Sequence, residues 1–210
     1  MRIPGRAVQG KLKAFSAAQV KVLLEECRNS PRWGLVFEAL LYTGMRIGEL
    51  SGLRWCHLVG NRLEVCEVVV SQAGMLVHRP ETKTWSGYRV LFLSSEALSV
   101  FERQRQAFEL LVGHPASPED FVFPNSSGGM MRPTRSNQHL KLFVKRLGLP
   151  PLSIHAFRHT YATLHLRAGV PVAVVSRNIG HRNITTTLNV YRHVLEDERE
   201  AHLINFSEVL

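Results

Sequence analysis

The 210-residue sequence predicts a mainly α-helical domain with a small three-stranded antiparallel β-sheet inserted after its third helix. Apolar residues recur at helical spacing before residue 54 and after residue 94, whereas β-branched residues concentrate between residues 63 and 93. With 45% apolar and 20% charged residues, the chain is expected to bury a core of its own. Its apolar runs fall short of the roughly 20 residues that a membrane span needs, so we expect no membrane association.

Three helices are predicted in the first quarter of the chain. Residues 16–19 (SAAQ) form a capping box that opens the first helix. Ser30-Pro31 predicts the start of the second helix, with the proline at its first position, and Gly44 ends it. A short third helix is expected from Ile47 to Leu53. Residues 1–13 hold four basic residues and no carboxylate, which is typical of a basic arm or a linker remnant.

Strands and further helices follow in that order. The strands are predicted at Leu63–Val70, Met75–Arg79 and Tyr88–Leu93. Ser94 or Ser95 is expected to cap a helix that runs to about Val112, and a loop covers residues 115–132. Later helices are predicted over about 134–147, 156–168, 171–179 and 185–193. Gly148, Gly169 and Gly180 are the expected C-caps.

Positive charge is concentrated in one block of the sequence. The chain has 26 basic and 17 acidic residues, a net charge of +9, and 20 of the basic residues are arginine. Residues 121–195 contain ten basic residues and no Asp or Glu, whereas the rest has 16 basic and 17 acidic residues. A merely soluble surface would intersperse the two signs. Arginine matches phosphate oxygens with its planar fork, so the block favours nucleic-acid binding.

The cysteines and the N-terminus indicate a cytoplasmic protein. Cys27, Cys56 and Cys66 are odd in number and lack metal-like pairing, which fits free thiols in a reducing cytosol. The first residues are basic but contain no apolar segment of the kind that a secretory signal has.

A metal site is not expected. His155 and His159 are four residues apart, as a helical metal pair would be, but Ala156 stands where the metalloprotease pattern needs Glu. A magnesium-dependent nuclease would need clustered carboxylates, which the basic block lacks.

Four islands of polar residues carry the candidate chemistry. They are GMRIGEL at 44–50, TKTWSGYR at 82–89, HAFRH at 155–159 and GHRNITTTLNVYRH at 180–193. A metal-free reaction on phosphate needs cations for the nonbridging oxygens, which Arg46 and Arg158 can supply, and a nucleophile, for which Tyr191 is the candidate. Each residue alone also has a structural interpretation, such as a surface ion pair between Arg46 and Glu49.

In this order and spacing, the four islands resemble the catalytic domain of the tyrosine recombinase (phage integrase) family. The resemblance extends from about Phe15 to the C-terminus and implies that family's fold over residues 14–210. It also implies that the separate N-terminal core-binding domain of full-length members is absent from this sequence. The segment 197–210 is amphipathic, and in the family such a segment often docks on a neighbouring protomer.

The resemblance implies a reaction as well. Tyr191 would attack a DNA phosphodiester, form a 3′-phosphotyrosyl bond and release a 5′-hydroxyl, without ATP or a divalent metal. Arg46 and Arg158 would hold the nonbridging oxygens, and Lys83 would act as the general acid. A 5′-hydroxyl of a partner strand would reverse the step.

The remaining family positions have supporting roles. His155 would assist proton removal from Tyr191, and His181 would hydrogen-bond the phosphate or the nucleophile. Glu49 would orient its neighbours. Asn178 occupies a position that is usually apolar in the family.

The partner that the resemblance implies is double-stranded DNA, bound by a homo-oligomer with a tetrameric synapse. The basic block supplies candidate phosphate contacts, namely Arg132, Arg135, Lys141 and Arg182. Two alternatives stay open: a non-catalytic DNA-binding module of the same fold, and a relaxing enzyme similar to type IB topoisomerases. The sequence determines neither the DNA target nor the biological role, such as integration, transposition, cassette exchange or dimer resolution.

Overall fold

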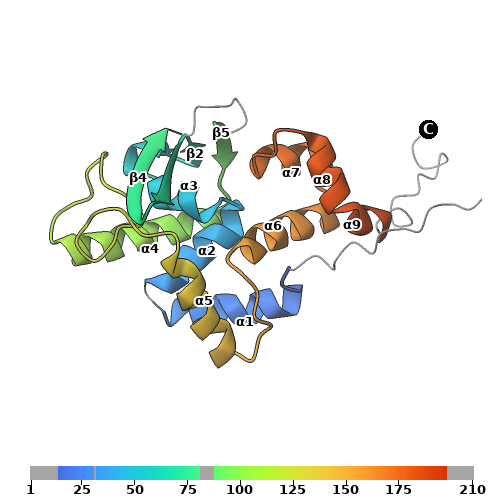
Figure 1. The fold of residues 1–210 in the computed structure, drawn as a ribbon, viewed down its shortest axis with the longest axis horizontal. Helices are drawn as coiled ribbons and strands as arrows, with labels where there is room; N and C mark the ends of the chain where they lie inside the picture. The colour runs from blue at the N-terminus through green and yellow to red at the C-terminus, as the bar shows by residue number, and fades with distance from the viewer. Residues whose placement is uncertain (1–13, 31, 81–87, 198–210) are drawn as a thin grey trace, which may run out of the picture.

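Helices supply most of the described structure, and strands gather at one side (Figure 1). The structure is a computed structural model that describes residues 14–30, 32–80 and 88–197. The helices are α1 (Ala17–Arg28), α2 (Trp33–Thr43), α3 (Ile47–Gly52), α4 (Ser95–Val112), α5 (Arg135–Arg146), α6 (His155–Arg167), α7 (Val172–Asn178), α8 (Ile184–Val190) and α9 (Arg192–Asp197). The predicted mainly helical class with a small antiparallel sheet is confirmed.

The start of α1 follows the prediction, whereas that of α2 differs from it. The Ser16 hydroxyl accepts a hydrogen bond from the amide of Gln19, and the Gln19 side chain accepts one from the Ser16 amide. Helix α2 begins at Trp33 with Arg32 at its N-cap, later than the predicted start at Ser30-Pro31. Ser30 contributes through its backbone carbonyl, which accepts the amide of Gly34, and Pro31 lies outside the described residues.

Helix α2 is the centre of the main core. Nine of its eleven residues are buried, and it packs against α1, α4 and α6. Phe37 of α2 stacks on Phe157 of α6 with ring centroids 5.4 Å apart. This contact fixes the start of α6, which carries one of the sequence islands, against the helix that ends at Gly44.

The strands within the described residues form two small sheets instead of the single sheet predicted. The expected strand over residues 63–70 divides into β2 (Arg62–Val65) and β3 (Glu67–Gln72). Strand β2 pairs with β1 (Leu58–Val59) and β5 (Arg89–Phe92) in a three-stranded antiparallel sheet, while β3 pairs with β4 (Met75–Pro80). The division reflects packing, because β3 lies directly against α3. A Cβ atom on Gly52 would lie 2.9 Å from the Val68 backbone, so the glycine permits this close approach.

Tyr191 divides the helix that was predicted over residues 185–193. It is the C-cap residue of α8, and α9 begins at the next position. The Tyr191 side chain belongs to a second, smaller apolar cluster that is distinct from the main core. Its buried members are Tyr161, Ala162, Leu166, Val175, Ile179, Tyr191 and Val194. Helix α6 contributes to both clusters and therefore connects the two parts of the molecule.

The structure also bears on the predicted helix-ending glycines, the cysteines and the absence of a membrane-spanning helix. Glycines 148, 169 and 180 follow α5, α6 and α7 with positive φ angles, as their predicted helix-ending role requires. The three cysteines are free thiols. Among the described helices, none is both long enough and apolar enough to cross a bilayer. Residues 1–13 and the part of 197–210 beyond Asp197 lie outside the described residues.

Gly44 and Gly113 offer a matched test of how tightly the end of α2 is packed. Both are left-handed helix C-caps, but a Cβ atom on Gly44 would lie 2.6 Å from the Tyr161 ring, whereas one on Gly113 would meet nothing within 4 Å. Gly113→Ala should lower the free energy of unfolding by about 1–2 kcal/mol, the cost of the left-handed conformation. Gly44→Ala should add a packing cost of about 1–3 kcal/mol. Equal losses in urea unfolding would contradict the packing described here.

Candidate active site

The sequence islands converge where α3, β5, α6 and α7 meet. Arg46 is the N-cap of α3, Arg158 lies in the first turn of α6, and His181 follows α7. Figure 1 shows β5 as the labelled strand on the side of α7, and the contacts between β5 and α7 agree with this view. Arg46 Nη2 donates to the carbonyl of Gly180 at 3.3 Å. This hydrogen bond joins the start of α3 to the segment after α7, more than 130 residues further along the chain.

A buried carboxylate, that of Glu49, organises the cationic side chains. The Arg46 amide and its Nη1 donate to Glu49 at 2.8 and 2.6 Å, and Arg89 donates from Nη1 and Nη2 at 3.1 and 2.7 Å. Burial alone would raise the pKa of Glu49, but the charges and hydrogen bonds of Arg89 and then Arg46 outweigh it and lower the pKa to about 2. The carboxylate is therefore ionised at neutral pH, and the expected orienting role of Glu49 has a physical basis.

Arg158 supplies a buried cation with unused hydrogen-bonding capacity. Its Nη1 donates to the carbonyl of Gly44 at 3.0 Å, while its Nη2 is buried and has no partner among the described residues. Burial and the nearby charge of Arg46 lower the pKa of Arg158 to about 9, so it is still protonated at neutral pH. A buried donor without a partner is costly, and an anion placed there would satisfy it.

The cluster formed by Arg46, Arg89, Arg158 and Glu49 carries a net positive charge that favours binding of an anion. Arg46, Arg89 and Arg158 contribute three positive charges, and Glu49 contributes one negative charge, which leaves a net charge of +2. The neighbouring histidines add no positive charge at neutral pH. Burial, followed by the charges of Arg158 and Arg46, lowers the pKa of His155 and brings that of His181 to about 4. A phosphodiester, with two nonbridging oxygens sharing one negative charge, fits such a cluster.

Tyr191 is enclosed beside the cationic cluster. Only 1% of its surface is exposed, and its hydroxyl lies 2.9 Å from Nδ1 of His159. Burial raises the pKa of Tyr191 to about 12, although the charge of Arg158 acts in the opposite direction. Burial and the nearby His155 and Arg158 lower the pKa of His159. A neutral His159 with its proton on Nε2 can accept the phenolic proton at Nδ1.

His159, and not His155, contacts the Tyr191 hydroxyl, although the family resemblance implies that His155 assists proton removal from Tyr191. Both residues lie on one face of α6 with ring centroids 6.5 Å apart, and His155 stands at the first position of the helix, where it is only partly covered. His181 is half-buried, and its Nδ1 lies 2.8 Å from Oγ1 of Thr187. This contact fixes one ring nitrogen of His181 and leaves the other nitrogen for a further partner.

Comparison with known proteins identifies the family. The family model described as "Phage integrase family" matches residues 13–198. The chain belongs to the phage integrase family. A XerC-like tyrosine recombinase of Caldanaerobacter subterraneus subsp. tengcongensis is 27% identical over 212 residues, which cover 93% of this chain and 54% of the relative. A transposase of transposon Tn916 from Enterococcus faecalis is 30% identical over 78% of this chain and 43% of its own. This phage integrase family chain thus spans about half the length of such relatives.

Solved structures share the fold of this phage integrase family chain. The integrase of transposon Tn1549, in a complex with transposon right end DNA, matches with a TM-score of 0.77 and 24% identity over 93% of this chain and 67% of its own. The XerA recombinase matches with a TM-score of 0.72 and 18% identity over 91% of this chain and 65% of its own. The recombinase catalytic-domain fold predicted from the four islands is confirmed.

Lys83 and Asn178 are two further positions of the predicted family site. Lys83 lies in residues 81–87, outside the described residues, so its role as a general acid remains a prediction. Asn178, which departs from the apolar residue usual in the family, donates from Nδ2 to the Tyr161 hydroxyl at 3.1 Å. The amide thereby satisfies the polar end of a buried tyrosine that packs beneath Gly44.

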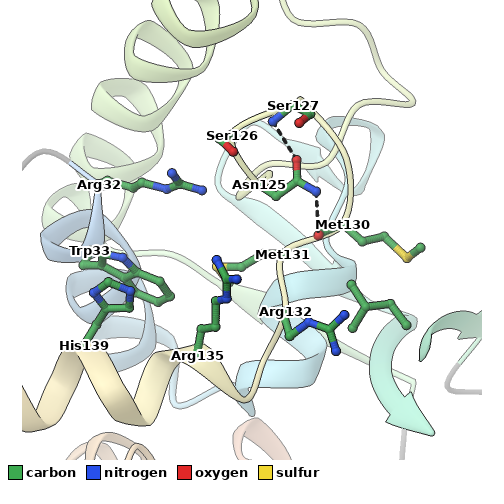
Figure 2. A pocket seen from close by; sticks show the side chains of 11 residues that line it. Arg32, Trp33, Asn125, Ser126, Ser127, Met130, Met131, Arg132, Arg135 and His139 are labelled. Atoms are coloured by element: carbon green, nitrogen blue, oxygen red, sulfur yellow. Dashed lines mark hydrogen bonds between the residues drawn. The ribbon is translucent and has the colours of Figure 1, made fainter. Parts of the chain in front are cut away.

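A pocket of about 420 Å³ lies away from Tyr191. It is lined by two of the four residues that are predicted to contact DNA, Arg132 and Arg135. Figure 2 shows Arg32 and Arg135 pointing into this pocket. Arg132 also lines it and donates to the carbonyl of Gly74 at 3.0 Å. The structure does not bring the other two residues into the pocket, and both are exposed, namely Lys141 on α5 and Arg182 after α7.

Sequence reasoning did not assign roles to Arg89 and His159, although both lie inside the quoted islands. Arg89 ends the hairpin island, and His159 ends the HAFRH island. For Arg89, the available signal was a charged residue at the start of a short strand.

In the part of the chain that the structure describes, no group of three or more His, Cys, Asp or Glu side chains is placed to hold a metal ion.

The Glu49 cluster predicts a specific pH dependence of stability. Because the folded-state pKa of Glu49 lies below its ordinary value of 4.5, its contribution is complete above about pH 4.5 and is lost as the pH falls toward 2. Glu49→Gln should therefore be less stable than the unsubstituted protein at pH 7 by about 3 kcal/mol, at 1.36 kcal/mol per pKa unit. The difference should shrink below pH 4.5.

The control for this measurement is Glu102→Gln. Glu102 is exposed on α4 and forms no ion pair with the described residues. Denaturant unfolding of the three proteins at several pH values measures the gap between them. A gap for Glu49→Gln that stays constant from pH 7 to pH 3 would contradict the ionised, arginine-bound carboxylate.

Proposed function

We propose that this chain is the catalytic part of a DNA strand transferase that cleaves and rejoins DNA through a 3′-phosphotyrosyl bond at Tyr191. The observation that carries the proposal is the cluster of Arg46, Arg89, Arg158 and Glu49, with its net charge of +2, beside a buried tyrosine whose hydroxyl contacts a histidine. Such a cluster binds one phosphodiester and presents a nucleophile and a proton acceptor to it.

The proposed reaction begins with the phosphate seated between Arg46 and Arg158. Oη of Tyr191 forms a bond to phosphorus as the bond from phosphorus to the 5′-oxygen breaks. The phenolic proton passes to Nδ1 of His159, and the leaving 5′-oxygen takes a proton from Lys83 to become a hydroxyl. The number of phosphate ester bonds is unchanged, so a 5′-hydroxyl from another strand can reverse the step without ATP. No metal takes part in any of these steps.

A proton acceptor is needed because Tyr191 is a weak acid in this site. With a pKa of about 12, only on the order of one phenol in 100,000 is ionised at pH 7. We therefore assign proton acceptance from Tyr191 to His159, the histidine in contact with its hydroxyl. His155 and His181 are proposed as neutral hydrogen-bond donors to the phosphate, because both lie near Arg158 and have lowered pKa values.

Double-stranded DNA is the proposed substrate. The uninterrupted basic block supports this assignment, as does the similarity to recombinase structures that were solved as DNA complexes. We further propose a tetrameric synapse and a trans-docking role for residues 197–210, as the family resemblance implies. The 14–210 unit is proposed as the catalytic domain, and Arg132, Arg135, Lys141 and Arg182 are proposed to contact phosphates.

Replacing Tyr191 tests the proposed chemistry. Tyr191→Phe removes only the hydroxyl, so covalent protein–DNA adducts should disappear while the dissociation constant for duplex DNA changes by less than about twofold. A nicked suicide substrate built from the DNA that flanks the gene, analysed on a denaturing gel, measures the adduct. Tyr42→Phe on α2 is the matched control and should form adducts normally.

The same assay separates the alternatives. If Tyr191→Phe still forms adducts, Tyr191 is not the nucleophile. If the unsubstituted protein binds DNA but forms no adduct, the chain is a non-catalytic DNA-binding module. If it relaxes supercoiled plasmid as a monomer at no specific site, the topoisomerase-like alternative is correct.

Salt dependence tests the proposed phosphate contacts. The logarithm of the DNA association constant should fall steeply with the logarithm of salt concentration, because each neutralised phosphate releases counterions. Arg135→Gln should reduce the slope by about one. Lys21→Gln, on the exposed face of α1 and outside the basic block, should leave the slope unchanged. Equal slopes for Arg135→Gln and the unsubstituted protein would remove Arg135 from the DNA footprint.

A further inference from the structure

Arg89 is a buried arginine that connects three segments of the site. Its side chain is only 4% exposed, and it stands at the first position of β5. Two of its nitrogens bind the two carboxylate oxygens of Glu49, and its Nε donates to the carbonyl of Asn178 at 2.7 Å. Each of these contacts joins β5 to a segment that carries another site residue.

The backbone after α7 wraps closely around the Arg89 guanidinium. Gly180 has a φ of +64°, and a Cβ atom there would lie 2.9 Å from Nη1 of Arg89. The next residue is His181, whose amide donates to the carbonyl of Ser176. The carbonyl of Gly180 in turn accepts from Arg46, so one short segment touches both arginines.

We propose that Arg89 is a positioning residue for the transesterification: by bridging Glu49 and the carbonyl end of α7, it sets the placement of Arg46 and of the His181 segment around the phosphate. The inference rests on the proposed function for its catalytic consequence, and on the contacts above for its geometry. Arg89 itself is not assigned to the phosphate, because each of its three nitrogens already donates to Glu49 or Asn178 and its side chain is buried.

A lysine cannot replace this arrangement. The guanidinium offers donors in a fixed planar fork that meets both oxygens of Glu49 and a backbone carbonyl at the same time. A lysine ammonium keeps the charge but acts as a single point, so it can neutralise Glu49 without holding Asn178 in place. Arg89→Lys therefore separates the geometric role of Arg89 from its charge.

The first experiment compares Arg89→Lys with Arg62→Lys. Arg62 is an exposed arginine on β2, the strand that pairs with β5, and is the matched control. We expect Arg89→Lys to increase hydrogen exchange in peptides covering residues 176–183 by roughly tenfold, and to slow adduct formation at saturating DNA by roughly ten- to a hundredfold. The dissociation constant for DNA should change by less than about twofold, and Arg62→Lys should match the unsubstituted protein.

Arg89→Gln provides a second variant with a pH readout. The groups that act on Glu49 are Arg46, Arg89, Arg158 and His155. Because Arg89 is the main influence that lowers the pKa of Glu49, its loss lets burial raise that pKa. Protonated Glu49 would release Arg46, so the adduct rate of Arg89→Gln should fall at a higher pH than the adduct rate of Arg89→Lys. Circular dichroism at each pH shows whether the protein is folded.

The outcomes are distinguishable from failure of the proposed function. If the unsubstituted protein forms no adduct but Arg89→Lys still exchanges faster at residues 176–183, the proposed reaction is wrong and the positioning geometry holds. If the protein forms adducts and Arg89→Lys changes neither exchange nor rate, the role of Arg89 is overturned. A loss of DNA affinity equal to the loss of rate, or failure of both variants to fold, would also overturn it.

Discussion

The arrangement of the site depends on one interaction, the burial of the Glu49 carboxylate between Arg46 and Arg89. Breaking a buried ion pair on one side leaves an uncompensated charge, so the three side chains are interdependent. Their contacts continue to the backbone carbonyls of Asn178 and Gly180 and thereby join α3, β5 and the end of α7. The cations are thus held in place by contacts within the protein, and such preorganisation is how an electrostatic site avoids reorganisation during a reaction.

Helix α6 connects this cluster to Tyr191, the proposed nucleophile. Its first turns carry Arg158, which faces the cluster, and His159, which contacts Tyr191 in the smaller apolar cluster. The same enclosure that raises the pKa of Tyr191 also keeps its hydroxyl within hydrogen-bonding distance of His159, the proposed proton acceptor. Burial of Tyr191 therefore raises the free energy that is needed to ionise its phenol. The positive charge of Arg158 offsets part of this increase.

Local signals in the sequence predicted most of the helices, and the family resemblance predicted that the islands form one site. The individual contacts between distant segments could not be predicted from the sequence. The capping box at Ser16 and the end of α2 at Gly44 are readable because caps act within a few residues. The division of strand 63–70 depends on α3 lying against β3, which no local pattern records. His155 and His159 share a helix face, so the position of Tyr191 alone decides between them. Arg89 resembles a surface charge until Glu49 is placed opposite it.

A structure of the Tyr191→Phe variant bound to a duplex that carries its cleavage site would show whether the arginine cluster binds the scissile phosphate beside residue 191. We expect one backbone phosphate within hydrogen-bonding distance of both Arg46 and Arg158, with the ring of residue 191 beside it and Glu49 still bound to Arg46 and Arg89. A duplex that lies across another face, with the arginine cluster empty, would contradict it.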